Sequence, residues 1–369
     1  MTARRVLFGF LFAVSAVPLL QASASPAAVP GAARFEARAA QRPAEAALDV
    51  RVVTDEPEAV LAIARKKEAG DPIGEEDWGR LFASEGYVRL KKREASLQRT
   101  FTDEDFKAFV LSEKTLSSAD VYEAQLAKWK TLDARAAAAV ALRYLPEGTK
   151  LRGRIYPSIK PRENSFVFEL TTDPAIFFYM NPAEAQPVSE NTLAHELHHV
   201  GFASGCDAAA EKKIAAYPER TARVLEVVGS FSEGLAMLAA AGGPDVHPHA
   251  TSTPEIRAGW DRDVANFDQD LRKVEAFFLD VLEGRLTDTS EIRKRHMDFF
   301  GFQGPWYTVG WRMAVTIEKA YGHDALVASF CDWTTLLPTY DRAARGANAK
   351  GGAQLATWSA RLIEAIGKR

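Results

Sequence analysis

The stretch from Thr192 to Val200 contains the pattern His-Glu-x-x-His. A step of four residues puts His195 and His199 one turn apart on one face of a helix, so both imidazoles can reach a single metal ion. Glu196 follows the first histidine and would lie beside the metal, where its carboxylate can take a proton from zinc-activated water. The pattern predicts one catalytic Zn²⁺, bound by His195 and His199, with Glu196 as general base.

A catalytic zinc ion takes three protein ligands and keeps one position open. Glu233 is the predicted third ligand, because a lone carboxylate within the apolar stretch 227–238 is costly to bury unless it is paired or coordinated. Gly234 would let this helix approach the zinc helix closely. Cys206 is the alternative ligand, spaced for a loop beyond the helix end. His198 faces away from the two ligands and is left out.

Hydrolysis of an amide builds negative charge beside the metal, so a group that stabilises this oxyanion is also needed. Tyr307 is the first candidate, because it opens a helix after Gly-Pro-Trp; the alternative is a packed aromatic ring. His247 and His249, in the loop after the Glu233 helix, are the second candidates. His296 and His323 carry no pattern that distinguishes them from surface residues.

The elements around these residues follow from periodicity and capping. Ser189 can cap the zinc helix, which would run to about Phe202 and end at Gly205. Three apolar or alternating runs before it predict a small antiparallel sheet: 151–159, 165–170 and 175–180. The chain is helical in pattern from 57 to 145, with Thr102 as an N-cap, and again after the zinc helix, apart from a loop at 242–254.

The predicted fold class is α+β and mostly helical, with the small antiparallel sheet next to the zinc-binding helix and a helical C-terminal lobe. Five regions are expected along the chain: a signal peptide (1–24), a disordered Ala/Pro-rich leader (25–47), an N-terminal helical region (48–148), a sheet with the zinc-site helices (149–241) and a C-terminal helical lobe (242–369).

The N-terminus has the pattern of a secretory signal peptide. Arg4 and Arg5 precede the apolar run Val6–Leu20, and a small-residue stretch follows with a cleavage site after Ala24. An uncleaved anchor helix is the alternative, but the run is short for a membrane span and contains a proline. We therefore expect an exported protein, periplasmic or secreted.

Composition limits the remaining classes. The formal net charge is −3, without the basic stripe that a nucleic-acid partner requires. No run after the signal region reaches the length of a membrane span. The two cysteines, Cys206 and Cys331, form a disulfide or remain buried thiols, since sequence alone does not show whether they are close. The oligomeric state is not specified by the sequence.

The His-Glu-x-x-His motif, followed downstream by Glu-Gly-x-Ala, resembles the gluzincin class of zinc peptidases, of which thermolysin is the familiar member. More narrowly, the chain looks like an uncharacterised bacterial family of predicted zinc-dependent peptidases. The resemblance covers about 55–340 and is carried by four segments: Leu81–Glu94, Ala194–His199, Ser232–Gly234 and Pro305–Trp311.

The resemblance implies a two-lobed site, in which 164–181 would supply an edge strand for an extended peptide. One departure matters: thermolysin-like enzymes carry an Asp shortly after the glutamate ligand that supports a zinc-binding histidine. Here 234–241 is all small or apolar, so the support must come from elsewhere.

The predicted function is hydrolysis of peptide bonds in a peptide or protein substrate, with Glu196 taking the proton of water and later delivering it to the leaving amine. Two alternatives remain. One is a zinc hydrolase of a non-protein amide, such as a cell-wall peptide. The other is a non-catalytic envelope binding protein on a degenerate metallopeptidase fold, which the retained Glu196 argues against.

Overall fold

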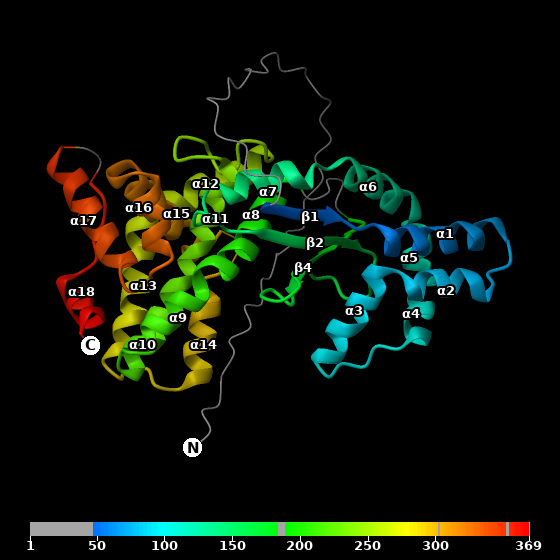
Figure 1. Ribbon diagram of the computed structural model, residues 1–369, viewed down its shortest axis with the longest axis horizontal. Helices are drawn as coiled ribbons and strands as arrows, with labels where there is room; N and C mark the ends of the chain where they lie inside the picture. Colours follow the sequence, from blue (N-terminus) through cyan, green and yellow to red (C-terminus); the bar gives the residue numbers. More distant parts are fainter. Residues whose placement is uncertain (1–46, 184–188, 302, 352–353, 369) are drawn as a thin grey trace, which may run out of the picture. The chain divides into compact units, whose positions relative to one another are not determined.

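The computed structural model describes residues 47–183, 189–301, 303–351 and 354–368 (Figure 1). The predicted signal peptide and nearly all of the predicted leader lie outside these residues. The chain divides into two compact units, each made of several stretches. Of the described residues, the N-terminal unit comprises 47–132, 153–169 and 173–183. The C-terminal unit comprises the described residues of 133–152, 170–172 and 189–368.

The N-terminal unit combines short helices with a four-stranded sheet. Its helices are α1 (Asp55–Ala69), α2 (Glu75–Ala83), α3 (Glu85–Ser96), α4 (Asp103–Val110), α5 (Glu113–Ser117) and α6 (Ala119–Thr131). The strands are β1 (Leu48–Val52), β2 (Leu151–Ser158), β3 (Phe166–Phe168) and β4 (Ala175–Tyr179). Thr102 caps α4 as predicted, because its hydroxyl accepts the N–H of Asp105 at 3.0 Å.

The sheet has the strand order β1-β2-β4-β3. β3 and β4 are antiparallel, but β2 and β4 are parallel, so the prediction of an antiparallel sheet was wrong in this respect. β1 is not among the predicted strands, and its five residues fall at the start of the predicted helical region. The mostly helical α+β class is confirmed.

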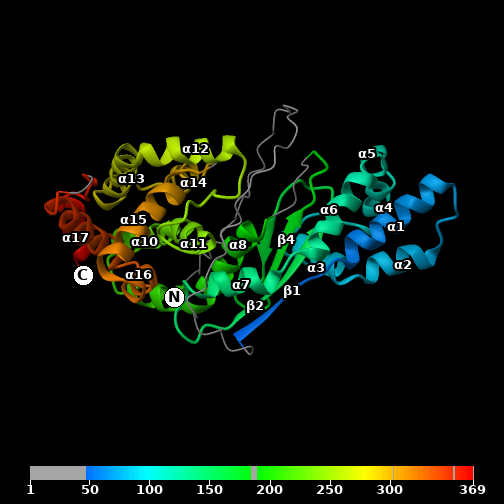
Figure 2. The ribbon, with the colours of Figure 1, turned by 90° about the horizontal axis from the view of Figure 1, so that it is seen from above.

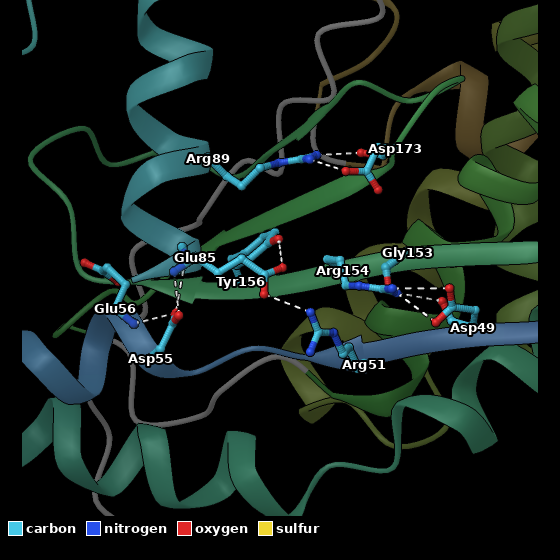
Figure 3. A network of polar contacts seen from close by, with 11 residues as sticks. Asp49, Arg51, Asp55, Glu56, Glu85, Arg89, Gly153, Arg154, Tyr156 and Asp173 are labelled. Carbon is cyan, nitrogen blue, oxygen red and sulfur yellow. Dashed lines mark hydrogen bonds and ion pairs between the residues drawn. The ribbon is translucent and has the colours of Figure 1, made fainter. Parts of the chain in front are cut away.

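Buried and exposed residues alternate in β1, whereas β4 and the second half of β2 are buried on both faces. In β1, Leu48 and Val50 are buried whereas Asp49 is exposed. Figure 3 shows the polar network that joins β1 and β2 to the start of α3. The Tyr156 hydroxyl donates to Glu85 at 2.7 Å, and the carboxylate of Asp55 accepts the backbone N–H of Glu85 at 2.5 Å. These contacts join the N-terminus of α3 to β2 and to the first residue of α1.

The C-terminal unit is helical in all its described residues apart from loops and the first residues of β2. Its helices are α7 (Ala134–Leu142), α8 (Glu190–Phe202), α9 (Ala208–Ile214), α10 (Glu219–Val228), α11 (Ser232–Ala241), α12 (Pro254–Ala265), α13 (Phe267–Leu282), α14 (Thr289–Asp298), α15 (Pro305–Tyr321), α16 (His323–Phe330), α17 (Leu336–Ala349) and α18 (Ala360–Gly367). α11 packs against α8 on one side and α15 on the other (Figure 2), around a core rich in aromatic side chains.

α8 ends at Phe202, as predicted, but the chain does not leave the helical path at Gly205. It continues through one π-helical turn, Ala203–Asp207, into α9. Gly205 is accommodated within that turn, where it lies against Pro146 and Thr149. Cys206, in the same turn, forms a disulfide with Cys331 at the end of α16. The disulfide that the sequence left open is therefore present.

One helical run, Glu219–Ala241, is long and apolar enough to cross a membrane by length and composition. It comprises α10, a 3₁₀ turn and α11, and 67% of its apolar window is buried inside the protein. Its apolar side chains belong to the core of the C-terminal unit. The length and apolar composition of this run are those of a core helix that its neighbours cover.

Candidate metal centre

The zinc helix α8 begins at the predicted cap. The Ser189 hydroxyl accepts the backbone N–H of Thr192 at 3.2 Å, which satisfies one of the free donors of the first turn. Leu193, Leu197 and Val200 are buried at helical spacing and hold this helix in the core. With the helix held in this way, the four-residue step from His195 to His199 puts both histidines on one face.

Glu233 lies in the first turn of α11 with 2% of its surface exposed. Gly234 next to it permits a very close helix crossing: a Cβ atom there would lie 1.9 Å from the backbone nitrogen of Trp311. A Cβ at Gly310 would lie 2.6 Å from the carbonyl oxygen of Phe231. The close approach predicted for Gly234 therefore exists, but its partner is α15 and not the zinc helix.

The structure brings His195, His199 and Glu233 together. The Nε2 atoms of the two histidines are 3.1 Å apart. Glu233 Oε2 lies 3.2 Å from His195 Nε2 and 3.0 Å from His199 Nε2. Ligands about 2.0–2.1 Å from a tetrahedral zinc ion are spaced about 3.3 Å from one another, so these donor atoms fit that ion. The three residues form a group that could hold one metal. Cys206, the alternative ligand, is engaged in the disulfide.

Electrostatics at this group favour a cation. Burial by itself would raise the pKa of Glu233, but the facing imidazoles of His199 and His195 lower it to about 2. Glu233 is therefore ionised at neutral pH and directs its charge to the two ring nitrogens. Burial raises the pKa of Glu196 to about 7, with His195 acting in the opposite direction. A cation beside Glu196 would act against burial, lowering this pKa and favouring the ionised carboxylate.

Tyr307 lies in the first turn of α15, and its ring is nearly parallel to that of His195, with centroids 6.2 Å apart. Its hydroxyl lies close enough to Glu233 for that carboxylate to act on it. Burial, with the negative charges of Glu233 and Glu196, raises the pKa of Tyr307 well above its ordinary value. The hydroxyl therefore stays protonated and keeps a hydrogen to donate.

His247 and His249 use both ring nitrogens in contacts of their own. His247 contacts Asp261 at 3.0 Å through Nε2 and accepts the backbone N–H of His249 at 2.9 Å through Nδ1. His249 contacts Ser252 at 3.0 Å and Gln303 at 2.9 Å. Burial lowers the pKa of His249 to about 4, so this ring is neutral. These contacts brace the loop after α11.

The other histidines lie outside the group. His198 is fully buried, with Nε2 3.2 Å from the carbonyl oxygen of Tyr144, and faces away from the ligands as expected. His296 is half-buried and contacts the Ser230 hydroxyl at 2.7 Å, so the prediction of a plain surface residue was wrong for it. His323 is partly exposed and lies 3.4 Å from a carboxylate oxygen of Glu318.

Two residues near the group were missed by the sequence reasoning. Asn191, one turn before His195, donates from Nδ2 to the carbonyl oxygen of Pro248 at 2.9 Å. Gln303, two residues before α15, contacts His249. The four-residue step from Asn191 to His195 could have drawn attention to the asparagine. The contact of Gln303 joins residues 54 positions apart and has no local signal.

Comparison with known proteins gives one family. The model of the family DUF5700, described as "Putative zinc dependent peptidase", matches residues 78–349, which is well over half of the chain. The match includes His195, Glu196, His199, Glu233 and Tyr307. No curated protein and no solved structure matches the chain significantly.

Proposed function

Because the chain belongs to this zinc-dependent peptidase family, we propose that it is an exported zinc metallopeptidase of the gluzincin type that hydrolyses peptide bonds. The convergence of His195, His199 and Glu233 within hydrogen-bonding distance of one another carries the proposal. Two histidines one turn apart and a glutamate from a second helix are the ligand set of the class that the sequence resembles. A zinc ion supplies Lewis acidity, which activates water and polarises a carbonyl group.

Glu196 is the proposed general base. It follows His195 on the same helix, is 5% exposed, and is not one of the three converging residues. Burial raises the pKa of this carboxyl group and a neighbouring cation would lower it again, so the group can be ionised when it takes a proton from water and can return that proton to a leaving amine. The same carboxyl group would perform both transfers, since it lies close enough to His195 and Glu233 for both to influence its pKa.

Tyr307 is the proposed oxyanion donor. Its hydroxyl stays protonated and lies beside Glu233, whereas the ring nitrogens of His247 and His249 are already engaged with other groups. A protonated phenol that is fixed by a helix and faces the metal ligands can donate to negative charge that develops on a substrate oxygen. This contrast favours Tyr307 over the loop histidines.

Export rests on the signal-peptide pattern of residues 1–24 and is supported by the disulfide. Disulfides persist in oxidising compartments and are rare in the reducing cytosol. The Cys206–Cys331 bond pairs both cysteines of the chain and joins segments 125 residues apart. A periplasmic or secreted location is consistent with both features.

Two substitutions test the proposal. Glu196→Gln keeps the shape of the side chain and removes its ability to accept a proton, so this variant should bind zinc like the parent and lose nearly all cleavage of an unstructured protein. Glu233→Ala removes a ligand and should lose most of the bound zinc. Metal content and cleavage at neutral pH are measured on the same samples. Parental cleavage by Glu196→Gln, or parental zinc content in Glu233→Ala, would contradict the assignment.

A further inference from the structure

His195 lacks a hydrogen-bond partner on one of its two ring nitrogens. Its Nε2 faces His199 and Glu233, so a metal ion in this group would be bound through Nε2 and the proton of the neutral ring would reside on Nδ1. Nδ1 is buried and has no hydrogen-bond partner among the described residues. Metal-binding histidines almost always donate this second N–H to a carboxylate, a carbonyl group or water, which fixes the ring orientation.

Asn191 offers an unpaired acceptor one turn earlier on the same helix. Its Oδ1 is also buried and without a partner in the described structure. Residues four apart lie on one helical face, and side chains in a helix lean towards its N-terminus, so the imidazole of His195 leans towards Asn191. An unpaired donor and an unpaired acceptor thus occupy neighbouring positions on α8.

The hydrogen bond of Asn191 Nδ2 fixes the orientation of the Asn191 amide. Nδ2 donates to the carbonyl oxygen of Pro248 at 2.9 Å, and a carbonyl oxygen can only accept. The oxygen of the amide, and not its nitrogen, is therefore the atom left for His195. Pro248 lies between His247 and His249, whose contacts brace this loop.

Gln303 Oε1 is another buried acceptor without a partner in the described structure. It lies 3.6 Å from the position that a Cβ of Gly259 would take, which places it against α12, and the same amide is tied to His249. The Glu233 oxygen that contacts His195 faces Nε2 and not Nδ1. Asn191 is the acceptor that shares a helical face with His195.

We propose that Asn191 is a positioning residue for the metal ligand His195. Its Oδ1 accepts the Nδ1–H of His195, directly or through one water molecule, after a small rotation of the ring or the amide when the metal is bound. The Pro248 carbonyl holds the amide in the accepting orientation. This contact takes the place of the aspartate support that follows the glutamate ligand in thermolysin-like enzymes. The inference rests on the proposed metal site but not on peptidase activity.

Zinc affinity tests the inference without any substrate. Full-length variants are titrated with Zn²⁺ in competition with a chromophoric chelator. Asn191→Ala removes the acceptor and should raise the zinc Kd by about 10- to 100-fold, the range typical of losing such a partner. Asn191→Asp keeps an acceptor for His195 but cannot donate to Pro248, and its Kd should stay within about 3-fold of the parent or improve. Glu190→Ala, one residue earlier and exposed, is the matched control and should bind as the parent does.

The pair of variants separates the two contacts of Asn191. If Asn191→Asp loses as much affinity as Asn191→Ala, the Pro248 contact is what matters and the inference is wrong. Parental affinity in Asn191→Ala would also overturn it. Thermal unfolding of the metal-free variants shows whether any loss reflects a damaged fold. A parent that binds zinc but cleaves nothing would contradict the proposed function alone, whereas a parent that binds no zinc would contradict both.

Discussion

The Tyr307 hydroxyl combines two properties that an oxyanion donor needs: it stays protonated, and the first turn of α15 fixes it beside Glu233. Tyr307→Phe removes only this hydroxyl. We expect kcat to fall by about 10²-fold or more, the scale of losing one such donor, while zinc content stays at the parental level. Steady-state kinetics on a peptide substrate, with metal analysis of the same sample, provides the measurement.

Tyr321→Phe is a suitable control for that variant. It makes the same change at the other end of α15, where the side chain is 49% exposed, and should leave kcat unchanged. An unchanged kcat in Tyr307→Phe would instead assign this ring to packing against His195. Loss of zinc in Tyr307→Phe would show that the hydroxyl mainly supports Glu233 as a ligand.

Glu56 in the N-terminal unit should make stability depend on pH. It is 1% exposed, and burial raises the pKa of its carboxyl group from 4.5 to about 8, although one oxygen accepts the N–H of Ile159. Between these values the folded state holds a proton that the unfolded state has lost. This contribution to stability is therefore present at low pH and falls as pH rises from about 4.5 to about 8.

Glu56→Gln replaces the carboxyl group by a neutral amide of the same shape. The variant should be more stable than the parent at pH 8, where each pKa unit corresponds to about 1.4 kcal/mol, and nearly equal to it at pH 4. Thermal unfolding across this range measures the difference, with the exposed Glu75→Gln as control. A difference that is the same at both pH values would refute the assignment.

At the scale of elements, the crossing of α11 and α15 should tolerate no added atom. A Cβ at position 234 would meet backbone atoms of α15 at 1.9 Å, which side-chain movement cannot relieve. Gly234→Ala should therefore destabilise the fold by several kcal/mol and lower zinc content, because the helix that carries Glu233 must move. Gly346→Ala is the control: it lies in α17 with nothing within 4 Å and should stabilise by up to about 1 kcal/mol. Equal stability of the two variants would show that the crossing is loose.

Helices and their caps could be predicted because their signals are local. Ser189 and Thr102 cap their helices as expected, and the loop between α11 and α12 runs from Gly242 to Thr253. Pairing between strands could not be predicted, since the parallel register of β2 with β4 is set by chain segments about twenty residues apart. The π-helical turn at 203–207 was missed because Gly205 usually ends a helix.

In the candidate site, too, features with a local sequence signal could be predicted and contacts between distant segments could not. His195 and His199 come together through helical spacing alone, and Glu233 could be inferred from the cost of burying its charge. The contacts of His247 and His249 with Asp261 and Gln303 depend on how α12 and the start of α15 pack. The sequence therefore predicted the three converging residues better than the contacts that hold the neighbouring loop in place.

At the scale of the whole molecule, the Cys206–Cys331 disulfide should contribute much of the stability of the C-terminal unit. It links residues 125 positions apart, and closing a loop of this length restricts the unfolded chain by roughly 5 kcal/mol at most. Reduction should lower the midpoint of thermal unfolding by several degrees, and a Cys206→Ser/Cys331→Ser double variant should unfold at that lower temperature with or without reductant. A midpoint that reductant leaves unchanged in the parent would show that the bond contributes little.

The interleaved order of the two units has a consequence for synthesis of the chain. The central strands β2 and β4 of the N-terminal unit follow α7 of the C-terminal unit, which begins at Ala134. When α6 leaves the ribosome, β1 has no neighbour to pair with, and β4 is complete only about fifty residues later. At about 5–20 residues per second this delay is roughly 3–10 seconds. During that interval the nascent chain has an unpaired strand and helices without the sheet on which they pack, which favours binding by chaperones that hold nascent chains unfolded.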